Sequence, residues 1–200
     1  MRSREFVMKD GYSFDINAEN MHLSYKTICK AYYEIFNVKL GLNTILNKAE
    51  NGPIGGNLSH EVSIATPIGE NLLEIDKKYA TETKLSFNEW YNLHAQDIEK
   101  EQNDKINKDN KNLENISNKS NNLNQKYITT TSTEIGHIFA FDQKYTKALD
   151  FRITNKNNEL TYAYMTSFGI GVTRLLQLLV EKYYKNGKLL LPEIITPIKL

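Results

Sequence analysis

A polar stretch in the middle of the chain limits where a hydrophobic core can form. Residues 96–126, QDIEKEQNDKINKDNKNLENISNKSNNLNQK, are rich in Asn and Lys and contain no aromatic residue. Such a composition buries too little apolar surface to offset the entropy lost when a chain is ordered. We therefore expect residues 77–130 to form a polar insertion, either a solvated helix or a disordered segment. Residues 1–76 and 131–200 are then two parts of one folded core.

The length and the charge of the chain exclude several classes of protein. Its 200 residues suit one domain of ordinary size. With 25 Lys and Arg against 24 Asp and Glu, it is neither a cationic nucleic-acid coat nor an acidic tail protein. Its single cysteine, Cys29, permits neither an intrachain disulfide nor a cysteine-based zinc site. No apolar run approaches the ~20 residues of a membrane span, so we expect a cytoplasmic protein without a membrane partner.

Strand and helix patterns flank the polar stretch on both sides. Residues 4–16 alternate like a strand, and apolar residues recur every three or four positions between Asn17 and Val38, which predicts a helix closed by Gly41. Antiparallel strand pairs with helices between them indicate an α+β fold. The other expected elements are strands over 42–49, 59–66, 70–76 and 132–142, a short helix that docks through Trp90 and Leu93, a helical turn over 145–148, a hairpin of 151–154 with 160–167, and a helix from 172 to Gly187.

Arginine is rare enough in this lysine-rich chain to draw attention. Only positions 2, 4, 152 and 174 carry it. Arginine offers a planar fork for phosphates and carboxylates and a face that stacks on rings, which lysine lacks. On a strand, the period of two puts Arg2, Arg4 and Phe6 on one side, where they can bind phosphate and stack on a base. The alternative is an exposed strand with scattered charges.

A second candidate for phosphate binding is the segment FGIGVTR, residues 168–174. It predicts a glycine turn directly before a helix, whose free N–H groups and Arg174 attract anions. The segment is not G-x-G-x-x-G and opens no βαβ unit, which excludes a Rossmann dinucleotide site, and the chain has no Walker A sequence.

Two short segments combine histidine with glutamate. SHEV contains His60 and Glu61, and EIGHIF contains Glu134 and His137. Their spacings match no zinc motif, so we predict no resident metal site. Structural histidines and surface glutamates are the simpler interpretation.

Four segments of the chain, taken in order, resemble the catalytic core of bacterial-type prolyl-tRNA synthetases, which are class II aminoacyl-tRNA synthetases. These segments are REFVMKDGYSF, GPIGGNLSHEV, TEIGHIFAFDQKY and MTSFGIGVTR. The first segment resembles the second half of motif 2, and FGIGVTR resembles motif 3. The other two segments are specific to the proline enzymes. The resemblance implies part of an antiparallel sheet flanked by helices. The gap between SHEV and EIGHIF is too short for an editing domain and fits the compact type.

The resemblance also implies the roles of individual residues. Arg2 and Arg174 would grip the phosphates of ATP as the catalytic pair, with Mg²⁺ accompanying the nucleotide, and Phe6 would stack on adenine. Glu61 would pair with the ring ammonium of proline, and His137 would reach its carboxylate or the nucleotide. The remaining expected contacts are Arg4, Gly169 and Gly171 for ATP, and Met8, Ser59, His60, Phe139 and Ser167 for proline.

The implied reaction is the ATP-dependent activation of proline to prolyl-adenylate, followed by transfer to tRNA(Pro). The chain begins inside motif 2 and lacks motif 1 of the dimer interface, the T-x-E segment and the anticodon-binding domain expected after Pro197. We therefore expect a truncated catalytic fragment with little proline-dependent ATP–pyrophosphate exchange by itself. Two alternatives are a non-catalytic remnant or synthetase-like module that binds a nucleotide or a partner, and an RNA-binding module that uses the lysine-rich insertion.

Overall fold

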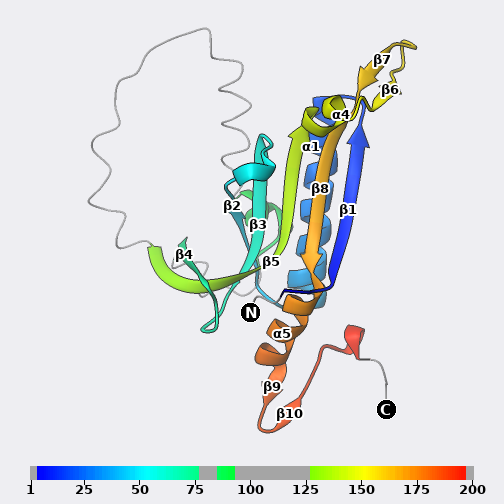
Figure 1. Ribbon diagram of the computed structural model, residues 1–200. Coiled ribbons are helices and arrows are strands. Elements are labelled where there is room, and N and C mark those ends of the chain that lie inside the picture. The colour runs from blue at the N-terminus through cyan, green and yellow to red at the C-terminus, as the bar shows by residue number, and fades with distance from the viewer. Residues whose placement is uncertain (1–3, 77–84, 93–126, 197–200) are drawn as a thin grey trace, which may run out of the picture.

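The computed structural model describes residues 4–76, 85–92 and 127–196. Its centre is a sheet of six strands, in which five follow the order β1-β8-β5-β3-β2 and β4 pairs with the first half of β5 (Figure 1). All of these pairs are antiparallel, which confirms the predicted α+β fold. The strands are β1 (Met8–Asp15), β2 (Ile45–Lys48), β3 (Leu58–Ala65), β4 (Asn71–Asp76), β5 (Tyr127–Asp142) and β8 (Tyr164–Gly171).

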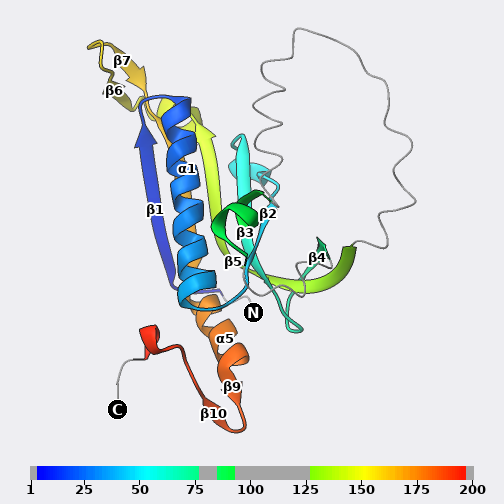
Figure 2. The same cartoon turned by 180° about the vertical axis from the view of Figure 1, so that it is seen from behind.

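One long helix covers one face of this sheet, as Figure 2 shows. Helix α1 (Ala18–Tyr33) continues into the π-helix η1 (Glu34–Lys39), and Gly41 follows with a φ of +59°. The Asn17 side chain caps α1 by accepting a hydrogen bond from the Asn20 N–H at 2.8 Å. The apolar stripe predicted from the sequence is the buried side of the helix. Of the predicted positions, Met21, Tyr25, Tyr32 and Phe36 are buried, whereas Ile28 and Ile35 are half-buried. Cys29 and Tyr33 are buried on the same helix in addition.

The opposite face of β1, β8 and β5 is left open by the helices that the structure describes. Helix α5 (Val172–Tyr183) starts where β8 ends and runs away beyond the sheet (Figure 1). We call this side the open face. Helix α1 lies on the opposite side of the sheet from the open face (Figure 2).

The segment of residues 87–92 is helical and is anchored by Trp90. The indole is 1% exposed, donates to the carbonyl oxygen of Thr44 at 2.7 Å and packs against the rings of Tyr33 and Phe87. This confirms that Trp90 docks on the core, whereas Leu93 lies outside the described residues.

Two differences from expectation lie between β5 and α5. The expected strand over 160–167 is divided at buried Ala163, so β6 (Arg152–Thr154) pairs with β7 (Leu160–Tyr162) while β8 joins the main sheet. Gly169 and Gly171 lie in β8 and form no turn. The predicted helical turn is α4 (Lys144–Ala148).

The helix expected to run to Gly187 ends earlier, at Tyr183. The chain forms a hairpin of β9 (Tyr184–Lys185) and β10 (Lys188–Leu189) instead. Asn186 and Gly187 have φ values of 52° and 77°, the left-handed pair that a tight two-residue hairpin turn requires. The short helices η2 (Gly52–Ile54) and η3 (Glu193–Ile195) complete the described elements, and none of the described helices is long and apolar enough to span a membrane.

The contacts of Trp90 predict a large loss of stability when its ring is removed. We expect Trp90→Ala to lower the free energy of unfolding by about 3–5 kcal/mol, because it leaves a cavity and an unpaired Thr44 carbonyl. Urea denaturation followed by circular dichroism measures the change. Leu160→Ala, in the exposed β6–β7 hairpin, is the control and should change stability by about 0.5 kcal/mol or less. Equal effects of the two substitutions would contradict the anchoring role.

Candidate active site

The strand register brings most of the expected site residues to the open face. Across β3, β5 and β8, Ser59 lies opposite Phe139 and Phe139 opposite Ser167. One step along the same face, Glu61 lies opposite His137, which lies opposite Gly169. Because side chains alternate along a strand, these two rows share one side of the sheet.

A β-bulge adds Glu134 to this face. Val62 pairs with Gly136 and Ser63 with Glu134, so Ile135 is an extra residue on β5. In a regular strand, Glu134 and His137 would point to opposite faces, because they are three residues apart. The extra residue shifts the alternation by one, so Glu134 points to the same face as His137. Its Oε1 atom lies 3.0 Å from His137 Nδ1.

His137 is held by hydrogen bonds at both ring nitrogens. The carboxylate of Glu134 only accepts, so Nδ1 carries the proton, and Nε2 accepts from the Ser59 hydroxyl at 2.6 Å. The order hydroxyl, imidazole, carboxylate is also that of hydrolase triads. Ser59, however, is 1% exposed, so its hydroxyl orients the ring and is not open to attack a substrate.

Arg174 joins the same network from the first turn of α5. Its Nη1 atom donates to the carbonyl oxygen of Glu134 at 2.7 Å and lies 3.5 Å from the Glu134 Oε2 atom. Burial raises the pKa of Glu134, but the hydrogen bond from His137 and the neighbouring Arg174 guanidinium outweigh burial, and the net shift is downward. The carboxylate is thus ionised across the physiological range.

Glu61 completes a group of three potential metal ligands. Its Oε1 atom lies 3.9 Å from His137 Nδ1. One ligand atom from each of Glu61, Glu134 and His137 lies within 4.8 Å of the others. Two carboxylates at this spacing can bind a hard divalent cation.

The beginning of α5 is tied to the residues just before β1. The Val172 N–H donates to the Val7 carbonyl at 2.9 Å, and the Val7 N–H donates to the Thr173 hydroxyl at 2.9 Å. The next residue, Met8, pairs with Gly171, and its sulfur lies close to Gly169. The two segments that resemble motifs 2 and 3 therefore meet.

Some expected residues lie elsewhere. Arg4 and Phe6 precede β1, so the strand alternation used to align them does not apply, and Phe6 is 54% exposed. Arg2 is outside the described residues. His60 is fully buried on the α1 side of β3, where its Nδ1 atom lies 2.7 Å from the Tyr25 hydroxyl. The structure does not bring His60 to the open face.

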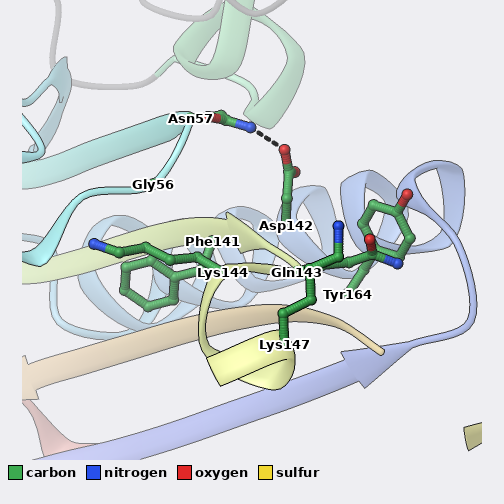
Figure 3. Close-up of a pocket in the computed structure, with 8 residues that line it drawn as sticks. All are labelled: Gly56, Asn57, Phe141, Asp142, Gln143, Lys144, Lys147 and Tyr164. Atoms are coloured by element: carbon green, nitrogen blue, oxygen red, sulfur yellow. Dashed lines mark hydrogen bonds between the residues drawn. The ribbon is translucent and has the colours of Figure 1, made fainter. Parts of the chain in front are cut away.

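The aromatic residues of β5 lead from His137 toward a pocket. The His137 and Phe139 rings stack at 3.8 Å between centroids, and Phe139 stacks on Phe141 at 5.4 Å. Beyond Phe141 lies a pocket of about 450 Å³, shown in Figure 3. Gly56, Asn57, Phe141, Asp142, Gln143, Lys144, Lys147 and Tyr164 line it.

Sequence reasoning missed both Glu134 as a site residue and this pocket. Period-two alternation places Glu134 on the wrong face, and no sequence signal marked the bulge. The hairpin of residues 151–154 with 160–167, which follows β5 in the chain, is expected from the sequence. The approach of α4 to the glycine loop 51–57 is not. Only the glycines at 52, 55 and 56, all with positive φ, hinted that this loop has a special shape.

The lowered pKa of Glu134 predicts a pH-dependent contribution to stability. It is present above the ordinary glutamate value of 4.5 and is lost as the pH falls through the lower pKa of the folded state. We expect Glu134→Gln to reduce the free energy of unfolding at pH 7 by about 1–3 kcal/mol and to flatten its decline in acid. Urea denaturation at pH 7 and in acid tests this, with Glu159→Gln in the exposed hairpin as the control. An unchanged acid decline would contradict the network.

The chain matches a known protein family over most of its length. The model of the tRNA synthetase class II core domain (G, H, P, S and T) matches residues 1–183. The chain is 34% identical over 201 residues to a proline–tRNA ligase of Wolbachia sp. subsp. Drosophila simulans. It is 35% identical over 204 residues to that of Rickettsia africae and 37% over 199 residues to that of Ehrlichia canis. Each match covers the whole chain but only 44% of the relative.

Solved structures show the same fold. Prolyl-tRNA synthetase of Cryptosporidium parvum, complexed with L-proline and AMP, matches 98% of this chain with a TM-score of 0.59 at 15% identity. The Giardia lamblia enzyme, in complex with prolyl-adenylate, matches 96% with a TM-score of 0.59 at 16% identity. The chain covers 28% and 26% of these two proteins. It belongs to the tRNA synthetase class II core family, and within that family it is similar to the proline–tRNA ligases.

Proposed function

We propose that this chain is part of the catalytic core of a proline–tRNA ligase. Such an enzyme activates proline with ATP and transfers it to tRNA(Pro). The observation that carries the proposal is the network of Ser59, His137, Glu134 and Arg174 on the open face. It combines a fixed cation with an oriented imidazole on an uncovered sheet. The chain spans less than half the length of its curated relatives, so the activity, substrates and partners of the whole protein are part of this proposal.

ATP is proposed to lie near the start of α5. Arg174 supplies a guanidinium for the phosphates, and Gly169 and Gly171 allow a ligand to approach the backbone of β8 closely. The tie between Val7 and α5 keeps the preceding residues nearby. By resemblance, this preceding segment supplies the remaining ATP contacts, namely Arg2 and Arg4 to phosphate and Phe6 to adenine.

The carboxylates of Glu61 and Glu134 are proposed to hold Mg²⁺ when ATP is bound, because both ring nitrogens of His137 are already engaged in hydrogen bonds. Two carboxylates fit the preference of this ion for oxygen ligands, and the Arg174 guanidinium lies beside Glu134. The bound ion would neutralise charge on the phosphates.

Proline is proposed to bind between β1 and β3. The Glu61 carboxylate can pair with the ring ammonium, while Met8, Phe139 and Ser167 contribute apolar and small surfaces on the same face. Ser59 acts through His137, which it orients. His60 acts from the opposite face by supporting β3 against Tyr25, and its assignment as a direct proline contact stays a prediction.

The proposed chemistry needs positioning and charge neutralisation rather than a protein nucleophile. The proline carboxylate forms a bond to the α-phosphorus of ATP while the bond to pyrophosphate breaks. The 3′-terminal ribose hydroxyl of tRNA(Pro) then attacks the prolyl carbonyl, forms the ester and releases AMP. By resemblance, the whole protein is proposed to be a homodimer in the cytoplasm, although motif 1 of the dimer interface is not in this sequence. Of the polar insertion expected over residues 77–130, residues 127–130 belong to β5 instead.

The role of Arg174 gives a direct test with a matched control. We expect Arg174→Ala to weaken ATP binding by about tenfold to a hundredfold, because it removes charge-assisted hydrogen bonds to phosphate. Isothermal titration calorimetry with ATP and Mg²⁺ measures the affinity. Arg152→Ala removes an arginine whose contacts are Asp150 and Tyr162 in the exposed hairpin, and it should leave the affinity unchanged.

Equal losses from both arginine variants would point to nonspecific electrostatics. No loss from Arg174→Ala would contradict the proposed ATP position. Arg174→Ala also breaks the contact with Glu134, so each variant's thermal unfolding is recorded to confirm that the chain is folded.

A further inference from the structure

The sequence contains the dipeptide Asn-Gly twice, at Asn51–Gly52 and at Asn186–Gly187. Asparagine followed by glycine is chemically labile, because the glycine nitrogen has no side chain beside it that hinders an attack on the asparagine side chain. The fold places one dipeptide in the loop beside the core and the other at the tip of an exposed hairpin. The two identical dipeptides are therefore expected to react at different rates.

The side chain of Asn51 is bound and shielded. Its Nδ2 atom donates to the Gly56 carbonyl at 2.6 Å, and its Oδ1 atom is buried. Its main-chain carbonyl accepts from the Gly55 N–H at 3.0 Å, and its backbone is in the right-handed helical region, with a ψ of −19°. The nitrogen that has to leave in a reaction is thus held in place, and the side-chain carbonyl is shielded from water.

Asn186 lacks these restraints. With Gly187 it forms the turn between β9 and β10, which lies at the far end of α5, away from the sheet (Figure 1 and Figure 2). All residues from 184 to 190 are exposed. Within the described part of the chain, neither the Asn186 side chain nor the Gly187 N–H has a hydrogen-bond partner, and a Cβ placed on Gly187 would meet nothing within 4 Å. Both reacting groups are therefore open to each other and to water.

The hairpin around Asn186 opens at little cost. Its two strands have 2 residues each, which is too short to build an apolar core of their own. Lys185 lies directly opposite Lys188 in the register, and like charges in this position destabilise a pair of strands. Short exposed elements of this kind have the lowest local stability in a fold. Local opening therefore brings the Gly187 nitrogen within reach of the Asn186 Cγ atom.

The same two lysines favour the reaction. The Gly187 nitrogen gives up its proton as it attacks, and nearby ammonium groups stabilise the negative charge that develops. The product carries a carboxylate where the neutral amide was, between Lys185 and Lys188. Its charge offsets the repulsion between these two cations.

We propose that Asn186 is a site of spontaneous deamidation, with water as the only co-reactant. The Gly187 nitrogen forms a bond to Asn186 Cγ, the bond from Cγ to Nδ2 breaks, and the amide group leaves as ammonia with the Gly187 proton. Water then opens the succinimide ring at either carbonyl and leaves aspartate or isoaspartate. Isoaspartate adds a methylene group to the main chain, so the turn that aligns Lys185 with Lys188 is lost.

The modification changes the path of the chain beyond the core. The hairpin closes on the end of α5, because the Leu190 N–H donates to the Tyr183 carbonyl at 3.0 Å. The Tyr183 hydroxyl in turn donates to the Leu40 carbonyl at 2.6 Å, which fixes this end of α5 to the core. The hairpin thus sets the direction in which the residues after Leu190 leave the core. An altered turn releases the Leu190 contact, whereas the contact of Tyr183 with Leu40 remains.

The test incubates the folded chain in mildly alkaline buffer made with heavy-oxygen water and follows two peptides by mass spectrometry. Cleavage after glutamate in ordinary water releases residues 182–193, whose only asparagine is Asn186, and residues 51–61, which contain Asn51. We expect Asn186 to gain the heavy oxygen about tenfold faster than Asn51, because Asn51 reacts only after its hydrogen bonds break. Fragmentation assigns the label to a residue, and a protein isoaspartyl methyltransferase identifies isoaspartate.

Two controls separate the effect of the fold from that of the sequence. In urea, Asn51 and Asn186 should gain label at similar rates, because the folded contacts are gone. Asn186→Gly keeps a residue suited to the left-handed turn and removes the amide, so it should gain no label at this position and unfold at the same temperature. These measurements do not depend on the binding of proline or ATP.

Two results would overturn the inference. The first is that Asn51 and Asn186 gain label at equal rates in the folded chain. The second is that Asn186 stays unlabelled in the folded chain over a time in which the urea-unfolded chain reacts fully.

Discussion

The pairing register of β3, β5 and β8 decides which side chains of this chain can meet. It aligns Glu61, His137 and Gly169 in one row and Ser59, Phe139 and Ser167 in the next. The bulge at Ile135 then turns Glu134 to the same side. Without this one extra residue, His137 would lose its carboxylate partner and Arg174 would lose the anion that fixes it.

The hydrophobic core sets this register and keeps one face of the sheet open. Helix α1 buries Met21, Tyr25, Cys29 and Tyr32 against the strands, and the following η1 buries Phe36. The Gly136 position shows how close this packing is, because a Cβ there would come within 3.0 Å of the Tyr32 ring. Polar groups on the covered face therefore need partners inside the core, as His60 finds in Tyr25. On the open face, the side chains of His137 and Glu61 stay partly exposed.

Sequence patterns predicted the parts of this structure that follow a regular period. The α1 stripe, the Asn17 cap and the docking of Trp90 all follow from local spacing and composition. The resemblance named Arg174, Glu61 and His137, and their contacts depend on strand pairing. The bulge at Ile135, the early end of α5 at Tyr183 and the pocket at Lys147 could not be predicted, because each depends on long-range packing or on a break in periodicity.

We propose that the open face binds the aminoacyl-adenylate. The most direct measurement is a backbone NMR titration of the chain with a nonhydrolysable prolyl-adenylate analogue. We expect shift changes at the open-face positions Glu61, His137 and Gly169 and none at Cys29 on the α1 side. Shift changes centred on α1, or none at saturating analogue, would contradict it.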